Sequence, residues 1–163
     1  MDPCTRRIFA DLRDLRKRKL DDGTNNIIVK VDEKNMRIMY VVIIGAKGTP
    51  YEGGFYFFLV EFPEDYPHKC PKVKFCTLDK GVRFNPNLYR DGKVCLSLLG
   101  TWSGPGWTSC CTIASILLSI QSLVLHDKPL TNEPGFENSP KESKSCFAIV
   151  IVNIASIIPS KTS

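Results

Sequence analysis

Residues 84–100 read FNPNLYRDGKVCLSLLG, a stretch with few features of a helix or a strand. Asn-Pro and Asp-Gly are turn formers, because proline fixes φ and because Asn, Asp and Gly tolerate tight backbone geometry. The segment therefore delivers Cys95 in a short extended setting, a few residues after Asn87. A cysteine near a fixed amide donor suits acyl transfer, in which the amide stabilises the oxyanion. The alternative is one more buried thiol, because free cysteine is among the most buried residue types.

Composition indicates a single globular domain with a hydrophobic core. The chain has 163 residues, of which 43% are hydrophobic and 24% are charged. Its net charge of +5 is modest, and no basic stripe with a reader motif is visible, so nucleic acid is not an expected partner. The basic run is local to the N-terminus, where it most often marks a solvated helix face: Arg6, Arg7, Arg13, Arg16, Lys17, Arg18 and Lys19.

The cysteines favour reduced thiols over a metal site or a disulfide framework. There are seven of them, no Cys-x-x-Cys occurs, and only His68 and His126 could join them, so no zinc site is expected. No signal peptide opens the chain, and no apolar run approaches the roughly 20 residues of a membrane span. We therefore expect a cytoplasmic or nuclear location and no membrane partner.

Hydrophobic periodicity predicts a helix followed by an antiparallel meander. Asp2-Pro3 is a plausible helix start, and apolar residues then repeat at helical spacing through about Lys19, namely Ile8, Leu12, Leu15 and Phe9. β-branched and aromatic runs predict strands over residues 26–31, 37–44, 55–62 and 72–76. This order of elements is an α+β layout.

A second helix is predicted after a Gly- and Pro-rich loop at residues 101–107. Thr108 or Ser109 can cap it. Its buried face is expected to comprise Ile113, Ile116, Leu117, Ile120, Leu123 and Val124.

From about residue 138 the pattern changes. Residues 147–158 are nearly continuously apolar and β-branched, which would make an exposed tail prone to aggregation. We therefore divide the chain into a domain at 1–137 and a divergent tail at 138–163, and we expect marginal stability.

Asn85-Pro86-Asn87 followed by Cys95 resembles the His-Pro-Asn signature and active-site cysteine of ubiquitin-conjugating (E2) enzymes, with Asn85 in place of the histidine. Further strings are most similar to the Z branch of that family: VRFNPN at 82–87, GKVCLS at 92–97, LGTW at 99–102 and NEPGFE at 132–137. The likeness runs from about Thr5 to Glu137. It implies the ubiquitin-conjugating (UBC) fold, with an N-terminal helix, a four-stranded antiparallel meander and a central helix. The C-terminal end is atypical, because family members continue with two further helices.

The resemblance implies transthiolation followed by aminolysis. An activating enzyme (E1) presents ubiquitin or a ubiquitin-like modifier as a thioester, Cys95 carries the acyl group, and a substrate lysine attacks it, usually with a ligase (E3) bound. No metal or organic cofactor is implied. No histidine is visible near Cys95, which argues against a Cys-His protease, because such a pair needs an adjacent base.

The resemblance also assigns expected roles to particular residues. Asn87 stabilises the oxyanion or holds the loop that does so, Asn85 and Pro86 brace this loop, and Tyr89 packs beneath it. In the family, polar residues on the loop that follows the central helix lie beside the active cysteine and orient the incoming lysine. Asn132 and Glu133 hold the nearest matching positions in this sequence, and Asp127 is a weaker candidate. The E1- and ligase-binding surfaces are expected to include Arg6, Arg7, Arg13, His68 and Trp107.

Two other classes of function stay open. One is an inactive E2-like binding module whose altered C-terminus has removed activity, although modules of that kind normally lack the cysteine. The other is a scaffold that uses the basic helix to bind partners.

Overall fold

The structure is a computed structural model in which residues 2–21, 25–77 and 85–132 are described. Helix α1 (Pro3–Lys17) is followed by the strands β1 (Ile27–Val31), β2 (Ile38–Ile44), β3 (Phe55–Glu61) and β4 (Lys72–Phe75). The 3-10 turn η1 (Ser97–Leu99), helix α2 (Ile113–Ser119), the π-helical turn η2 (Ile120–Val124) and the 3-10 turn η3 (Pro129–Asn132) complete the order. The predicted helix, meander and second helix are confirmed. The predicted tail lies outside the described residues.

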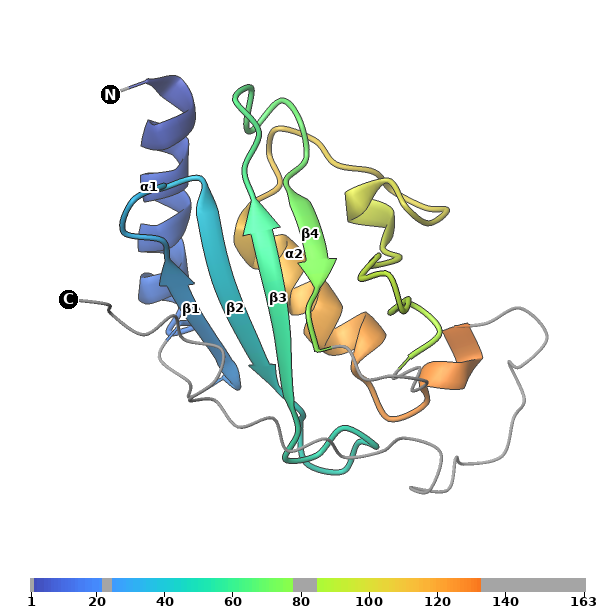
Figure 1. Ribbon diagram of the computed structural model, residues 1–163. Helices are drawn as coiled ribbons and strands as arrows, with labels where there is room; N and C mark the ends of the chain where they lie inside the picture. Colours follow the sequence, from blue (N-terminus) through green and yellow to red (C-terminus); the bar gives the residue numbers. More distant parts are fainter. Residues whose placement is uncertain (1, 22–24, 78–84, 133–163) are drawn as a thin grey trace.

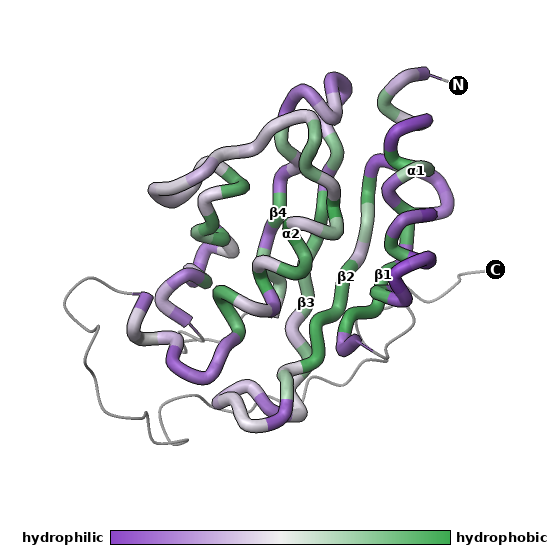
Figure 2. Tube along the Cα trace, turned by 180° about the vertical axis from the view of Figure 1, so that it is seen from behind, coloured by the Kyte–Doolittle hydropathy of each residue, from purple (hydrophilic) through white to green (hydrophobic). Residues whose placement is uncertain are grey.

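The sheet is an antiparallel meander whose one face is buried. Its strand order is β1-β2-β3-β4, and burial alternates along β2 and β3, as the two-residue period of a strand requires. The buried side chains are Met39, Val41 and Ile43 of β2 and Tyr56, Phe58 and Val60 of β3. Helix α2 crosses the face behind β3 and β4, and α1 stands at the β1 edge (Figure 1). Seen from behind, hydrophobic residues run along β1, β2 and α2 (Figure 2).

Helix α1 begins and ends where the local chemistry requires it. Asp2 caps it by accepting a hydrogen bond from the Thr5 amide at 3.0 Å, and Pro3 occupies the first turn, where its missing N–H costs nothing. Ile8 and Leu15 are fully buried as predicted. Phe9 is 39% exposed, so its assignment to the apolar face is wrong: that face is centred on the line from Cys4 to Leu15.

Two details of the second helix differ from the prediction. Its cap is Thr112, which exchanges hydrogen bonds with Ser115 in a capping box, and not Thr108 or Ser109. The reason is that residues 108–111 form a turn ahead of the helix, in which the Cys111 amide donates a hydrogen bond to the Thr108 carbonyl at 2.9 Å. Leu123 is 56% exposed, because η2 holds more residues per turn than an α-helix and rotates this side chain away from the sheet.

A buried carboxylate on α1 connects this helix to the loop between β3 and β4 and to the start of α2. Asp11 is 3% exposed although it lies on a helix rich in basic residues. It accepts hydrogen bonds from the Tyr66 hydroxyl, from Arg7 Nε at 2.9 Å and from the Ile113 amide at 3.3 Å. A buried charge is tolerated only when its oxygens are satisfied in this way. Asp11 therefore fixes where the start of α2 sits relative to α1.

No helix within residues 2–21, 25–77 and 85–132 has the length and apolar character needed to cross a membrane.

Replacing Asp11 by alanine should destabilise the fold by about 3 kcal/mol, because it leaves a guanidinium, a phenol and an amide without their acceptor. Urea denaturation followed by circular dichroism measures the change. Glu64→Gln is the matched control, since Glu64 pairs with Arg37 at 3.2 Å while 87% of its side chain is exposed, and such surface pairs contribute little. Equal stability of the two variants would contradict the role given to Asp11.

Candidate active site

Residues 85–95 form a compact turn beside the edge strand β4. The amide of Tyr89 donates to the Lys93 carbonyl at 2.9 Å, and the Phe75 amide at the end of β4 donates to the Gly92 carbonyl at 2.8 Å. Gly92 has a φ of 91°, a conformation that favours glycine. The Asp-Gly pair thus reverses the chain and docks the returning segment on the sheet.

The main chain of Cys95 is held at both its polar atoms by Asn87. The Cys95 amide donates to the Asn87 carbonyl at 2.8 Å, and Asn87 Nδ2 donates to the Cys95 carbonyl at 2.9 Å. Cys95 is 2% exposed but is not part of the apolar cluster that forms the core. The pattern differs from that of a core thiol, because polar contacts to one residue fix the position of this cysteine.

Thr101 holds the two peptide groups that flank Cys95. Its Oγ1 accepts from the Leu96 amide at 2.9 Å and donates to the Val94 carbonyl at 2.6 Å. The sequence by itself does not mark Thr101 as a site residue, because its one signal is its place in the LGTW string. Asn87 and Thr101 together satisfy every backbone polar atom from the Val94 carbonyl to the Leu96 amide.

The hydrogen bonds by which Asn87 and Thr101 hold the main chain around Cys95 form a clamp. Asn85 is fully buried next to it. Its Nδ2 donates to the Tyr51 hydroxyl and to the Val124 carbonyl, each at 2.6 Å, and its Oδ1 accepts from the Asn87 amide at 2.6 Å. These are contacts of the kind that a bracing residue needs. They join the loop between β2 and β3, the end of η2 and the active-site turn.

Asn132 comes from η3 and reaches the same cluster. Its Nδ2 donates to Asn87 Oδ1 at 3.1 Å and to the Leu123 carbonyl at 2.8 Å. Because Asn87 Oδ1 accepts from Asn132, its Nδ2 is the group that faces Cys95. Glu133 lies outside the described residues, and Asp127 is exposed.

Tyr89 does not pack beneath the turn as expected. It is 38% exposed, and Lys93 Nζ lies 5.5 Å from the centre of its ring. The reason is that residues 89–92 form a turn, in which the Gly92 amide donates a hydrogen bond to the Tyr89 carbonyl at 3.0 Å. Tyr89 to Asp91 therefore lie exposed at the tip of this turn.

The residues predicted to meet E1 and the ligase divide into two groups. Arg6 and Arg13 are exposed on α1. Arg7 instead donates to the Ser109 and Cys111 carbonyls at 2.9 and 2.6 Å. His68 Nδ1 lies 3.3 Å from Ser109 Oγ, and Trp107 Nε1 donates to the Pro67 carbonyl at 2.7 Å. Arg7, His68 and Trp107 thus converge where the loops at 62–71 and 107–112 meet α1.

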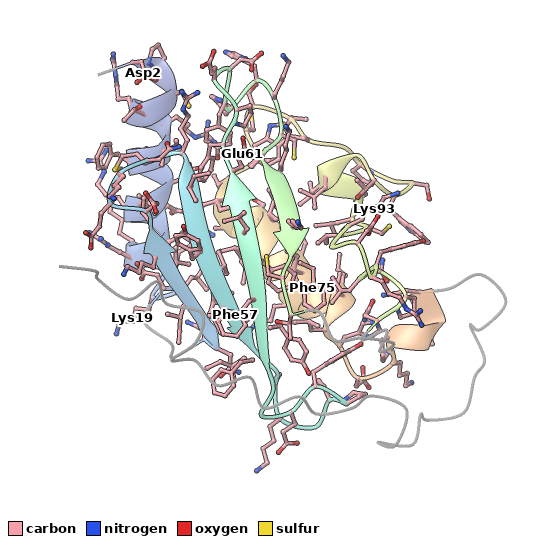
Figure 3. The ribbon with its side chains drawn as sticks, viewed as in Figure 1. Asp2, Lys19, Phe57, Glu61, Phe75 and Lys93 are labelled. Carbon is pink, nitrogen blue, oxygen red and sulfur yellow. The ribbon has the colours of Figure 1, made fainter. Side chains whose placement is uncertain are left out.

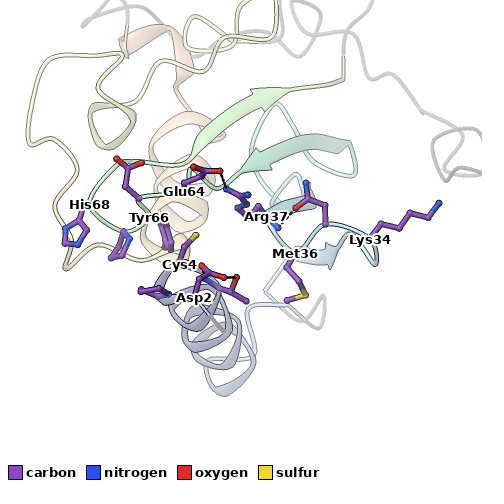
Figure 4. A pocket seen from close by; sticks show the side chains of 13 residues that line it. Asp2, Cys4, Lys34, Met36, Arg37, Glu64, Tyr66 and His68 are labelled. Atoms are coloured by element: carbon purple, nitrogen blue, oxygen red, sulfur yellow. Dashed lines mark hydrogen bonds and ion pairs between the residues drawn. The ribbon is translucent and has the colours of Figure 1, made fainter.

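A groove of about 690 Å³ lies at this end of the molecule, between the start of α1 and the loop that follows β3. Figure 4 shows Asp2, Cys4, Tyr66 and His68 along it, with the ion pair of Arg37 and Glu64 on its wall. It is separate from the cluster around Cys95, because none of the residues that hold Cys95 lines it.

Three of the thiols outside the active-site turn are held in their protonated form by burial. Burial raises the pKa of Cys70 to about 11 and also raises the pKa of Cys4 and of Cys76. These three thiols therefore stay protonated near neutral pH, and the thiolate is the reactive form.

In the part of the chain that the structure describes, no three His, Cys, Asp or Glu side chains gather in an arrangement that could hold a metal ion.

Comparisons with known proteins agree on one family. The sequence profile of the ubiquitin-conjugating enzymes matches residues 7–145. Ubiquitin-conjugating enzyme E2 Z of Danio rerio is 46% identical over 145 residues, and the match covers 87% of this chain and 43% of that protein. The Homo sapiens protein of the same name is 45% identical, with 87% and 40% covered. The chain thus spans about two fifths of the length of these curated relatives.

Solved structures show the same fold. Human ubiquitin-conjugating enzyme E2 G1 has a TM-score of 0.57 and 30% identity, and the match covers 69% of this chain and 87% of that one. A ubiquitin-conjugating enzyme E2 from Plasmodium falciparum has a TM-score of 0.58 and 30% identity, with 72% and 95% covered. The predictions of the UBC fold and of similarity to the Z branch are confirmed. The boundary at residue 137 stays a prediction.

Replacing Asn85 by alanine should cost about 2 to 3 kcal/mol of stability, because two buried acceptors and one donor lose their partner. Asn85→His should cost less, since a neutral imidazole supplies one donor and one acceptor. Tyr51→Phe, which removes only one of these contacts, is the matched control at about 1 kcal/mol. Thermal unfolding of the variants should follow this order, and an alanine variant as stable as the parent chain would contradict the bracing role.

Proposed function

Because the chain belongs to the ubiquitin-conjugating enzyme family, we propose that Cys95 accepts ubiquitin or a ubiquitin-like modifier from an E1 enzyme and passes it to a substrate lysine. The single observation that carries the proposal is the clamp on Cys95. Asn87 and Thr101 fix the main chain on both sides of the one cysteine in the family's signature frame. A nucleophile held in this way reacts with an oriented acyl group at a lower entropic cost.

Two acyl transfers make up the proposed reaction. In the first, solvent takes the proton of the Cys95 thiol, the resulting thiolate attacks the carbonyl carbon of the E1 thioester, and the E1 cysteine leaves as a thiolate. In the second, the amine of a substrate lysine attacks the new thioester. The Cys95 thiolate leaves, an isopeptide bond forms, and the proton that the amine loses passes to solvent. Since Cys95 is only 2% exposed, the groups that cover it have to move before either attack.

Asn87 is suited to both roles that the family resemblance leaves open. A carboxamide nitrogen carries two N–H groups, and one of them is used on the Cys95 carbonyl. The second N–H has no partner among the described residues, so it is available to a tetrahedral oxyanion formed at the sulfur. Asn132 supports this task from behind by fixing which end of the carboxamide faces the cysteine.

The proposed partners are an E1 enzyme, ligases and proteins that carry the acceptor lysine. We assign the exposed Arg6 and Arg13 of α1 to E1, and the convergence of His68 and Trp107 to ligases. A cytoplasmic or nuclear location belongs to the same proposal and is supported by six described cysteines that are all free thiols.

Cys95→Ser should trap the modifier as an oxyester that survives reducing agent, and Cys95→Ala should abolish loading. The measurement is a charging assay with E1, ATP and modifier, read on gels with and without reductant. Cys110→Ala is the control, because Cys110 is exposed and lies outside the clamp. Loading that persists in Cys95→Ala would move the site to another thiol. A parent chain that no pair of E1 and modifier charges would favour the inactive binding module.

Asn87→Ala should slow discharge of the preloaded enzyme onto free lysine by about a hundredfold, since one oxyanion donor is lost, and should affect loading less. Asn132→Ala should slow discharge by a smaller factor, because the carboxamide of Asn87 remains but loses the donor that orients it. Single-turnover discharge rates measure both effects. If the Asn87 variant discharged as fast as the parent chain, Asn87 would have no part in catalysis.

A further inference from the structure

Two adjacent cysteines lie on the loop that leads into α2. Cys110 is exposed, Cys111 is half-buried, and both are free thiols. Neither belongs to the apolar cluster that forms the core, and the proposed transfer at Cys95 uses neither. Two thiols on consecutive residues can be joined to each other, a reaction that a single exposed thiol lacks.

The side chain of Arg7 holds the main chain on either side of this pair. Its guanidinium donates to the Ser109 carbonyl at 2.9 Å and to the Cys111 carbonyl at 2.6 Å. The Cys111 amide donates to the Thr108 carbonyl at 2.9 Å, and the Thr108 hydroxyl lies 3.5 Å from Cys111 Sγ. These contacts fix the backbone of residues 109–111 in one conformation.

The same backbone positions the surface that we assign to ligases. Trp107 Nε1 donates to the Pro67 carbonyl at 2.7 Å, and Ser109 Oγ lies 3.3 Å from His68 Nδ1. Ser109 directly precedes the two cysteines in the chain, and Trp107 lies two residues before Ser109. A change of backbone conformation at the cysteines therefore reaches both contacts.

A disulfide between Cys110 and Cys111 requires such a change. Consecutive Cα atoms are about 3.8 Å apart, whereas the Cα atoms of a disulfide are usually about 4.4 to 6.8 Å apart. The bond closes a strained ring that contains the peptide group between the two residues, so this peptide has to turn. The turn breaks the hydrogen bond to Thr108 and displaces the carbonyls that Arg7 holds. Strained and exposed disulfides are also the ones that thiols reduce readily, so the bond is reversible.

We propose that Cys110 and Cys111 form a dithiol that hydrogen peroxide oxidises to a disulfide, and that this bond rearranges the surface around His68 and Trp107. The chemistry of the dithiol is independent of the proposed function, whereas its effect on ligase binding rests on it.

The oxidation takes place in two steps. In the first, the thiolate of one cysteine attacks an oxygen of the peroxide, the O–O bond breaks, hydroxide leaves and a sulfenic acid forms. In the second, the thiolate of the other cysteine attacks this sulfur, and the sulfenic hydroxyl leaves as hydroxide. The two hydroxides take up the two thiol protons as water. The pair of thiols loses two electrons, and the peroxide gains them.

The other described thiols are less open to this reaction. Cys95 and Cys4 are 2% and 4% exposed. Burial raises the pKa of Cys70 to about 11, which keeps this thiol protonated near neutral pH, and the thiolate is the form that peroxide oxidises. Cys76 is exposed, but it has no adjacent cysteine with which to form a bond.

The test uses the full chain with two background substitutions. Cys146→Ser removes a thiol that lies outside the described residues, and Trp102→Phe leaves Trp107 as the remaining one of the two tryptophans. Hydrogen peroxide should lower the intact mass by two hydrogen atoms, and peptide mapping should place the bond between Cys110 and Cys111. The emission of Trp107 should shift to longer wavelength, because its indole loses its contact with the loop between β3 and β4. Dithiothreitol should restore the mass and the emission.

Cys110→Ser and Cys111→Ser should each abolish the loss of two hydrogen atoms, because the remaining thiol has no adjacent partner. Each variant should also keep the emission of Trp107 unchanged when peroxide is added. A shift of the emission in these variants would show that the surface responds to something other than the disulfide, and the proposal would be wrong.

Cys76→Ser is the matched control, because it also removes an exposed thiol. Cys76 follows the last residue of β4 and is separated by the length of this strand, about 13 Å, from the loop that precedes it. Figure 3 marks this end of β4 by Phe75, and it marks the end of the molecule that carries the rearranged surface by Asp2 and Glu61. The variant should keep both the disulfide and the shift in emission.

The outcomes separate the dithiol from the proposed function. A bond from either cysteine to Cys70, a disulfide that forms without a shift in emission, or oxidation of Cys95 while Cys110 and Cys111 stay reduced would overturn the dithiol switch. These measurements need no E1 enzyme. Charging of the reduced chain by E1 reports the proposed function by itself, and its failure would leave the result on the disulfide standing.

Discussion

The hydrogen bonds between Asn87 and the main chain of Cys95 are the constraint on which the active-site region depends. Residues 85–96 belong to no helix and to none of the four strands, so their polar backbone atoms need partners of another kind. Asn87 supplies two of them, Thr101 supplies two more, and Asn85 and Asn132 hold Asn87 itself. The position of the sulfur is thus set by side-chain amides and one hydroxyl.

A second polar centre performs the same task at the opposite end of the fold. Asp11 gathers a phenol, a guanidinium and a backbone amide from three separate segments. Burial raises the pKa of Tyr66, as do the hydrogen bond and charge of Asp11, so this phenol remains a donor across the physiological range. The two centres are built from side chains that composition alone would place on the surface. Each is tolerated because its hydrogen bonds are satisfied.

The sequence predicted the parts of the fold that follow from periodicity. The bounds of α1 and of the four strands agree to within about two residues, since apolar spacing reports directly which face is buried. The second helix begins three or four residues later than predicted. The sequence did not predict the exposure of Phe9, Leu123 and Tyr89, because a helix edge, a π turn and a turn tip are decided by neighbours distant in the sequence. For the same reason, the burial of Asp11 was missed: its partners Tyr66 and Ile113 are 55 and 102 positions away. In the active site, Asn85, Asn87 and Cys95 stood out through the family motif, whereas the position of Thr101 became clear only from its contacts.

The asparagines around Cys95 also make the hydrogen bonds that support this residue insensitive to pH. A histidine in place of Asn85 would change its charge between about pH 5 and 8, and its pattern of donors and acceptors would change with it. A carboxamide neither gains nor loses a proton in that range. The contacts of Asn85 with Tyr51, Val124 and Asn87 therefore keep the same donors and acceptors from mildly acidic to neutral compartments, and the support of the nucleophile is independent of protonation.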